Sequence, residues 1–507
     1  MKTPVLLIPA PNGPAKLLPG SLALPDPLPV SLGGFAPDCL LAFAQRAGLQ
    51  VAAGGCSPLL RCVRNAAFPE EAYRLRVTQK AVEVEASTER GVIWALTSLF
   101  MLLEEGKSAP CCDAFDAPAM GYRGIMMDTC RHFFPVETLK ELIEEAALAK
   151  LNVLHWGLSN DQGWRVESFR FPGLHEQCAP DYYTQAQVRE IVEYARLRGV
   201  EVVPEINMPG HSTAMLAAFP ELGCRGVALE IGTQPGIYST ILCAGRESTY
   251  EFLLPLLEEI AALFPSPRFH IGGDEVPKKE WKTCPHCQKR MEELGLTDWE
   301  DLQGWFTCRV NEHLKSLGKE VFCWNETLLS AAAPQDITVQ YWAEMHKLGD
   351  TRRFYDAGGR LVYSDYLHLY LDQPHSFIPL KRVYHTTPET FEGPNTLGME
   401  CCVWTEFIET KERLWEQAFP RAIALAEAAW TRPAKKDYGD FLYRLGMWNV
   451  LRGGQFSLAP KRVDPPFGPA WKERVTWLRF LKNEPFNMEG VGGMHPRFLA
   501  KWIRYYL

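Results

Sequence analysis

Two adjacent carboxylates, Asp274 and Glu275, have the residue types and spacing that most clearly suggest chemistry in this sequence. They close the segment His270-Ile-Gly-Gly-Asp-Glu, which follows a short apolar run. Consecutive Cα atoms lie about 3.8 Å apart, so both side chains leave the chain at nearly the same point. The two glycines allow the backbone to approach a ligand closely. Acidic pairs are common in solvated loops, but after an apolar strand this pair suits a site with one protonated and one charged carboxyl group.

Other apolar runs also end in polar or aromatic residues. These candidates are His211, Trp324, Glu326, Trp342, Tyr370, Asp372, Trp404 and Glu406, with Arg123 at the start of the first run. Aromatic side chains pack on the apolar faces of sugar rings, while a few polar groups fix the hydroxyls. Each tryptophan taken singly is more simply a core residue. Their joint placement predicts a sugar-binding site.

The apolar runs that position these residues read as strands. Eight candidates follow residue 119, at 123–128, 152–158, 201–207, 269–274, 321–325, 338–342, 361–365 and 399–405. Helical patterns lie between several of them, one behind Pro135 and one behind a capping box of Thr184 and Gln187. Alternating strands and helices over about 300 residues predict a parallel (β/α)8 barrel of the TIM type. The active sites of such barrels lie at the C-terminal ends of the strands.

The regions on either side of this barrel have different patterns. Residues 1–118 predict a small α+β domain, with a hairpin around Tyr73 and Val84 and then a helix that contains Trp94. Residues 119–430 form the predicted catalytic barrel. Residues 431–507 predict a helical C-terminal extension packed on the barrel, with tryptophans at positions 448, 471, 477 and 502.

Composition excludes several classes of partner. The 507 residues are 47% hydrophobic and carry a net charge of −8, which allows a large core and two or three domains. No basic arm is present, so we expect no nucleic-acid partner. No run is long enough for a membrane span and no signal peptide is evident, so we expect a cytoplasmic protein. The sequence does not fix the oligomeric state.

The 15 cysteines are predicted to be mostly reduced core residues. Cys284-Pro-His-Cys287 is a single CxxC with no second pair at matching distance, and a structural zinc site needs four ligands. We therefore expect no metal, no cofactor and no dependence of activity on either.

At the positions above the chain resembles glycoside hydrolase family 20, the β-N-acetylhexosaminidases. The similar segments are GYRGIMMDTCRHF (121–133), KLNVLHWGLSNDQGWR (150–165), VVPEINMPGH (202–211), HIGGDE (270–275), WNE (324–326), YLD (370–372) and VWTE (403–406). They occur in the order typical of the family and cover nearly the whole predicted barrel. The 1–118 unit is similar to the α+β domain that often precedes it.

The resemblance implies an exo-acting retaining enzyme that removes terminal β-linked GlcNAc or GalNAc from glycans or glycoconjugates. Glu275 would be the general acid/base, and Asp274 would orient the acetamido group of the substrate, which attacks the anomeric carbon and gives an oxazolinium intermediate. The implied contacts with the sugar come from Tyr370, Trp324, Trp342, Trp404, Arg123, Glu406 and Asp372, with His211 behind them. The resemblance leaves open whether GlcNAc or GalNAc is preferred, which linkage is cleaved and whether substituted sugars are accepted.

One segment departs from the family pattern. The usual pattern in the family is HxHLxDDQGW, whereas this chain has Gly157 in place of the second His and Asn160 in place of the first Asp. That Asp normally supports the histidine and acid network. Either the network is neutral in this protein or Asp161 takes over the role.

Two alternatives remain. One is a retaining glycosidase with its own carboxylate nucleophile about 5 Å from the acid, for which Glu326 or Glu406 could serve. Neither would explain an Asp directly beside the acid. The other is a barrel that binds amino sugars without cleaving them, which loss of Asp274 or Glu275 would have supported. Both residues are present.

Overall fold

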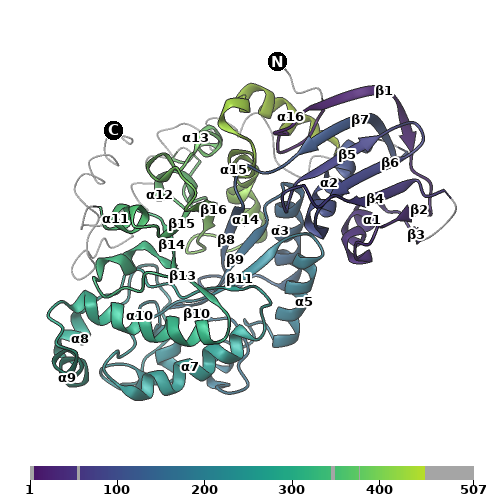
Figure 1. Cartoon of the computed structure of the whole chain (residues 1–507). Coiled ribbons are helices and arrows are strands. Elements are labelled where there is room, and N and C mark those ends of the chain that lie inside the picture. Colours follow the sequence, from purple (N-terminus) through teal and green to yellow (C-terminus); the bar gives the residue numbers. More distant parts are fainter. Residues whose placement is uncertain (1–4, 54–56, 105, 344–348, 376, 452–507) are drawn as a thin grey trace.

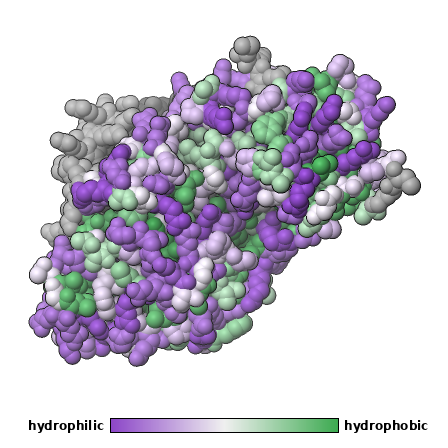
Figure 2. Space-filling model, in the orientation of Figure 1, coloured by the Kyte–Doolittle hydropathy of each residue, from purple (hydrophilic) through white to green (hydrophobic). Residues whose placement is uncertain are grey.

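The computed structural model describes residues 5–53, 57–104, 106–343, 349–375 and 377–451. Within these residues an N-terminal sheet domain lies beside a parallel barrel, at the upper right of Figure 1. The face in Figure 2 is mainly hydrophilic, and its hydrophobic side chains are scattered in small patches. None of the helices in the described ranges combines the length and apolar character that a membrane crossing requires.

The N-terminal domain is a seven-stranded mixed sheet with the order β1-β7-β5-β6-β4-β2-β3. Its strands are β1 (Ala15–Ala23), β2 (Leu28–Ser31), β3 (Val51–Ala53), β4 (Leu60–Arg64), β5 (Tyr73–Val77), β6 (Val82–Ala86) and β7 (Ser108–Asp116). The antiparallel pair β5–β6 buries every second side chain, which confirms the predicted hairpin. Its helices are η1 (Pro37–Leu40), α1 (Leu41–Ala47) and α2 (Glu89–Leu102), of which α2 packs on β5 and β6.

Eight parallel strands close the barrel in the order β8-β9-β11-β12-β13-β14-β15-β16, with β16 pairing back to β8. They are β8 (Tyr122–Asp128), β9 (Val153–Asn160), β11 (Glu201–Ile206), β12 (Arg268–His270), β13 (Glu320–Trp324), β14 (Thr338–Tyr341), β15 (Arg360–Tyr363) and β16 (Thr396–Val403). Each overlaps one of the predicted segments, so the predicted barrel is confirmed. A short strand, β10 (Gly163–Trp164), pairs antiparallel with β9. The eight barrel strands are buried on both faces, which explains their nearly continuous apolar runs.

Helices surround the barrel, and several short helices lie within the loops that connect its strands (Figure 1). They are α3 (Val136–Leu148), α4 (Gly173–Glu176), α5 (Gln185–Arg196), α6 (Thr213–Ala218), η2 (Pro220–Leu222), α7 (Glu247–Ala261), α8 (Lys279–Thr283), α9 (Pro285–Leu294), α10 (Trp299–Ser316), η3 (Asn325–Leu329), α11 (Asp350–Asp356), α12 (Tyr366–Leu369), α13 (Leu380–His385), η4 (Glu389–Phe391), α14 (Lys411–Ala418) and α15 (Arg421–Trp430). Thr184 and Gln187 form the predicted capping box at the start of α5.

The C-terminal segment begins with η5 (Pro433–Lys435) and α16 (Tyr438–Leu451). Trp448 is buried in this part, which fits the expected helical packing. The rest of the expected extension, including the tryptophans at 471, 477 and 502, lies outside the described residues.

The barrel interior is layered along the strand direction. Near the strand starts, five apolar side chains form a separate cluster: Tyr122, Val153, Val203, Phe322 and Val362. The next layer is polar, where His155 contacts Glu205 at 3.1 Å and Glu400 at 2.9 Å. Trp324 donates from Nε1 to Glu205 at 3.1 Å, so this polar layer supports the floor of the mouth above it.

Candidate active site

Asp274 and Glu275 lie where β12 ends at the barrel mouth, in a loop whose backbone conformation depends on glycine. Gly272 and Gly273 have φ values of 68° and 92°. A Cβ on Gly272 would lie 1.9 Å from Oδ1 of Asn207, so only glycine lets this loop close over Asn207. Nδ2 of Asn207 donates to Oδ1 of Asp274 at 2.8 Å. The glycines therefore fix Asp274 through the loop that follows the neighbouring strand β11.

Glu275 has a φ of 50°, which is uncommon outside glycine, asparagine and aspartate. Its side chain is 28% exposed, against 12% for Asp274. The adjacent acids therefore differ in environment, with Glu275 open to solvent and Asp274 held below it. Glu275 can therefore reach solvent and a substrate oxygen, whereas Asp274 is held in one position by Asn207.

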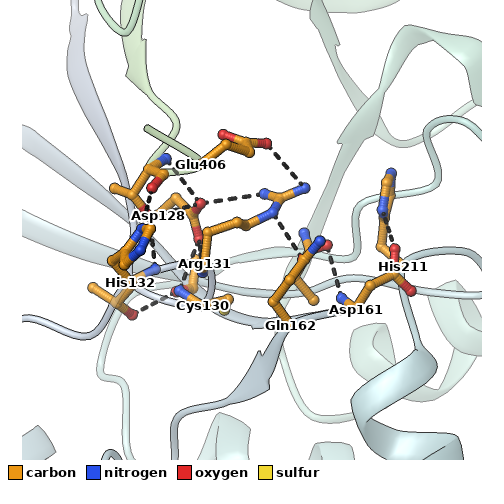
Figure 3. Close-up of polar contacts among 12 residues, drawn as sticks. Asp128, Cys130, Arg131, His132, Asp161, Gln162, His211 and Glu406 are labelled. Atoms are coloured by element: carbon orange, nitrogen blue, oxygen red, sulfur yellow. Dashed lines mark hydrogen bonds and ion pairs between the residues drawn. The ribbon is translucent and has the colours of Figure 1, made fainter. Parts of the chain in front are cut away.

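His211 connects both acids to a third carboxylate. Its Nδ1 lies 2.9 Å from Oδ2 of Asp161, and its Nε2 lies 3.4 Å from Oε2 of Glu275 and 3.6 Å from Oδ2 of Asp274. Thr213 also donates from Oγ1 to Oδ1 of Asp161 at 2.6 Å. Figure 3 shows the His211–Asp161 contact beside the group around Arg131. The open question about the departure at positions 157 and 160 is therefore answered, because Asp161 supports the histidine.

Asn160 has a local role. Its Oδ1 accepts a hydrogen bond from the backbone N–H of Asp161 at 2.8 Å. The side chain is buried and shapes the turn that presents Asp161. Asn160 therefore acts on the acid network indirectly, by holding the backbone of Asp161.

Burial and mutual charge set the protonation of this group. Burial alone would lower the pKa of His211, but Asp274 and Asp161 raise it well above the usual value. Burial raises the pKa of Asp274 to about 6, although His211 opposes the shift. Burial, with the charges of Asp274 and Glu275, raises the pKa of Glu326 well above the usual range. These shifts favour a protonated His211 and a protonated Glu326 on either side of Asp274.

The predicted aromatic residues form a continuous wall at the mouth. The ring centroids of Trp324 and Trp404 are 5.8 Å apart, those of Trp404 and Tyr370 are 6.3 Å apart, and those of Tyr370 and Trp342 are 6.1 Å apart. Nε1 of Trp342 donates to Oε2 of Glu326 at 3.3 Å. The structure thus brings together four aromatic residues from the ends of four different strands.

A polar rim lies on the other side of Trp404. The guanidinium of Arg131 sits 5.0 Å from the Trp404 ring centroid and contacts Glu406 at 3.5 Å and Asp128 at 3.3 Å. Figure 3 shows Arg131 between these two carboxylates, with Gln162 on its third side. Because its donors form a rigid planar fork, arginine is suited to fixing neighbouring hydroxyl groups.

Asp372 provides a further oxygen near this rim. Its Oδ2 accepts from Gln373 at 3.0 Å, while its buried Oδ1 has no hydrogen-bond partner among the described residues. Burial and the charge of Glu406 raise the pKa of Asp372 to about 8. A buried oxygen of this kind is costly unless a ligand group satisfies it, so it fits a position that a sugar hydroxyl would occupy.

The prediction that Arg123 contacts the ligand is wrong, because this residue lies far from the mouth of the barrel. Arg123 is near the start of β8, and in a parallel barrel all strand starts lie at the end opposite the mouth. Its guanidinium bonds Glu71 of the N-terminal domain at 2.5 Å and the carbonyl of Lys150 at 3.0 Å, and it lies 4.8 Å from the Trp430 ring centroid. Arg123 therefore joins the two domains.

Sequence reasoning also missed Arg131, Asp128 and Asn207. The signal was available for all three, because each follows or ends a strand at the mouth. The same rule that selected the ends of the later strands selects Arg131 over Arg123 on the first strand.

Comparison with known proteins agrees with this geometry. The sequence model "Glycosyl hydrolase family 20, catalytic domain" matches residues 120–433, and "Glycosyl hydrolase family 20, domain 2" matches residues 7–117. A β-hexosaminidase of Porphyromonas gingivalis is 36% identical over 412 residues, which are 74% of this chain and 53% of that protein. The chain thus spans about half the length of that relative.

Solved structures agree in fold. The β-N-acetylhexosaminidase of Bacteroides fragilis superposes with a TM-score of 0.81 at 30% identity, covering 89% of this chain and 96% of that one. A GH20 exo-β-N-acetylglucosaminidase of Vibrio harveyi, solved with N-acetylglucosamine, gives a TM-score of 0.81 at 29% identity over 90% of this chain and 79% of that one. With its two domains matched in order and its acids at the barrel mouth, this chain belongs to glycosyl hydrolase family 20.

Proposed function

We propose that this protein is an exo-acting, retaining β-N-acetylhexosaminidase that removes terminal β-linked GlcNAc or GalNAc from glycans or glycoconjugates. The observation that carries the proposal is the placement of Asp274 and Glu275 at one strand end, both within 3.6 Å of Nε2 of His211. The activities named for the relatives above support the same reaction.

In the first step, Glu275 donates its proton to the glycosidic oxygen as the bond from that oxygen to the anomeric carbon breaks. The carbonyl oxygen of the acetamido group forms the new bond to the anomeric carbon, which gives a cyclic oxazolinium ion. Asp274 accepts a hydrogen bond from the acetamido N–H and offsets the positive charge that develops there. Its carboxylate is already fixed by Asn207, so little reorganisation is needed during the reaction.

In the second step, the Glu275 carboxylate takes a proton from water as the water oxygen attacks the anomeric carbon. The bond to the acetamido oxygen breaks and Glu275 is again protonated. Two inversions at the same carbon give net retention. His211, held by Asp161, lies beside both acids, and its raised pKa favours a positive charge there.

The aromatic wall and polar rim fit the binding of one terminal sugar. Trp324, Trp342 and Trp404 would enclose the acetamido group and the ring face, with the hydroxyl of Tyr370 on the acetamido oxygen. Arg131, Glu406 and Asp372 would bind ring hydroxyls at the non-reducing end, which supports exo action.

A retaining mechanism with an enzymatic nucleophile is less well supported. Glu326 is buried and accepts a hydrogen bond from Trp342, and burial raises its pKa well above the usual range, which disfavours the carboxylate that a nucleophile needs. Glu406 is paired with Arg131. Glu326→Gln, which keeps a neutral side chain of the same shape, should therefore retain most activity, whereas a nucleophile in that position would lose nearly all of it.

A chromogenic N-acetyl-β-glucosaminide tests the activity and the corresponding β-glucoside tests the mechanism. We expect release of the chromophore from the first substrate alone, with the β-anomer as the first product by NMR. A barrel that binds amino sugars without cleaving them would bind GlcNAc but release no chromophore. The galacto-configured substrate then measures the preference between GlcNAc and GalNAc.

We also propose a cytoplasmic location, since none of the described cysteines forms a disulfide, as expected in a reducing compartment. Fractionation of the native cells tests this location. We keep the expectation that nucleic acid is not a partner, which an electrophoretic mobility assay checks.

A further inference from the structure

Four cysteine side chains meet in the loops next to the active site. They are Cys224, Cys243, Cys284 and Cys287, and their Sγ atoms all lie within 4.8 Å of one another. Three of the Sγ–Sγ distances are 3.8 Å for the pair 224–287, 3.7 Å for 243–284 and 3.6 Å for 243–287. These distances are far longer than the roughly 2.05 Å of a disulfide bond.

The spacing matches that of a tetrahedral metal site. A zinc–sulfur bond is about 2.3 Å, so the edge between two sulfurs in a tetrahedral site with four thiolate ligands is about 3.8 Å. The three distances above equal this edge to within about 0.2 Å, the tolerance expected for a metal site. Packed thiols can touch at similar distances, so the stronger observation is that four cysteines from two loops converge with all their Sγ atoms within 4.8 Å of one another.

Two loops supply the ligands. Cys224 and Cys243 belong to the segment between η2 and α7, which contains no regular helix or strand. Cys284 and Cys287 flank the first turn of α9, directly after α8. Irregular segments of this length are uncommon in compact domains without a constraint. A metal ion would cross-link the loop after β11 to the loop after β12.

The backbone around the sulfurs is packed for such a link. A Cβ on Gly245 would lie 2.2 Å from the backbone carbon of His286, so the two loops touch at main-chain level. Nε1 of the buried Trp281 donates to the carbonyl of Leu242 at 2.8 Å. Cys243, Cys284 and Cys287 are buried, which keeps bulk water away from their sulfurs.

The same loops carry the catalytic network. The backbone N–H of Leu242 donates to the carbonyl of Pro209 at 3.0 Å, two residues before His211. Thr240 contacts Thr213 at 2.8 Å, and Thr213 donates to Asp161. Glu275 precedes α8, which ends next to Cys284. Figure 1 shows α8 and α9 at the edge of the barrel opposite the N-terminal domain.

We propose that Cys224, Cys243, Cys284 and Cys287 bind one structural Zn²⁺ that fixes the loops carrying His211 and Glu275 relative to each other. Four protein thiolates fill the tetrahedral coordination, so the ion has no open position and takes no part in the hydrolysis. This proposal replaces the expectation of no metal. The CxxC does have partners, but Cys224 and Cys243 are too widely spaced in sequence to form a second motif. The proposal does not depend on the identity of the substrate.

The metal content of the full chain, purified without added metal or chelator, is the direct test. We expect about one zinc per chain by elemental mass spectrometry. Cys284→Ser and Cys243→Ser should each reduce this content at least tenfold and lower Tm. Cys308→Ser is the matched control, since Cys308 is half-buried and outside the cluster, and a serine hydroxyl can keep its contact with the Ala332 carbonyl. This control should retain the zinc.

A second measurement on the unmodified chain covers the case in which the variants do not fold. Replacement of the zinc by Co²⁺ should give the intense sulfur-to-metal charge-transfer and d–d absorption of a tetrahedral cobalt–thiolate centre. Less than about a tenth of an equivalent of zinc in the folded chain, an iron centre in its place, or disulfides among these four cysteines would each overturn the proposal.

Discussion

Nδ1 of His211 lies 2.9 Å from Oδ2 of Asp161, and the other ring nitrogen faces both Asp274 and Glu275. The imidazole is thus enclosed by three carboxylates in a buried position. Burial penalises the charged ring, but the acids outweigh it and raise the pKa of His211 well above the usual value. The charge of His211 in turn limits the rise in the pKa of Asp274 to about 6.

Asp161→Asn should move the acidic limb of the pH profile of kcat/KM to higher pH. Without the Asp161 charge the pKa of His211 falls, so less positive charge faces Asp274. The pKa of Asp274 then rises from about 6, and the carboxylate is lost at a higher pH as the solution is acidified. Rates measured from pH 4 to 9 on the chromogenic N-acetyl-β-glucosaminide test this.

The control for that profile is Asp181→Asn, which removes the same charge from an exposed site. We expect its acidic limb to match that of the unmodified enzyme. If Asp161→Asn also leaves the limb in place, His211 does not transmit charge to the acids.

Glu275→Gln should affect substrates according to their leaving groups. Protonation by a general acid contributes roughly 10²–10⁴-fold and matters most when the leaving group is poor. We expect hydrolysis of a GlcNAc disaccharide to be abolished and that of an activated aryl glycoside to be reduced less. An equal loss of activity on both substrates would show that Glu275 is not the general acid.

Asp274→Asn should lower kcat with a smaller change in KM. The charge on Asp274 acts mainly on the oxazolinium-like transition state, and loss of such stabilisation costs about 10²–10³-fold in kcat. A thiazoline analogue of the cyclic intermediate should bind the unmodified enzyme far more tightly than GlcNAc and lose most of that advantage in the variant. Inhibition constants for the analogue and for GlcNAc check this, and a covalent sugar adduct would contradict it.

The sequence was sufficient to predict the barrel and most of its mouth, because both depend on local signals. Buried parallel strands read as apolar runs, and the residue after each run is at the mouth by topology. The motif around Asp274 and the residues Trp324, Tyr370 and Glu406 were therefore found from their positions in the chain.

Other features depend on contacts between distant segments. The sequence does not show whether Asn160 or Asp161 contacts His211. The answer depends on which of these two adjacent side chains the turn directs toward the histidine. The cysteine cluster was missed because Cys224 and Cys243 meet Cys284 and Cys287 only when two loops pack. Arg123 was selected by its type and its place in a motif, although its position at the strand start already placed it away from the mouth.

Arg131 and Arg123 lie at opposite ends of the barrel, so their loss should have different effects. Arg131→Ala should raise KM and lower kcat/KM about tenfold or more, since hydrogen bonds to charged groups contribute about 1.5–3 kcal/mol. Arg123→Met should leave KM nearly unchanged but lower the free energy of unfolding by about 3–5 kcal/mol, because it leaves the buried Glu71 carboxylate without its positively charged partner. The control, Arg170→Met, breaks an exposed pair with Glu258 and should cost no more than about 1 kcal/mol.

The pH dependence of unfolding separates these roles further. Burial would raise the pKa of Glu71, but Arg123 lowers it below the usual value. A carboxylate with a lowered pKa in the folded state contributes stability above its unfolded pKa of about 4.3, and that contribution is lost as the pH falls. Urea unfolding from pH 7 to pH 3 should therefore show a smaller acid-induced loss of stability in Arg123→Met than in the unmodified protein. A raised KM for Arg123→Met with unchanged stability would instead show that Arg123 contacts the sugar.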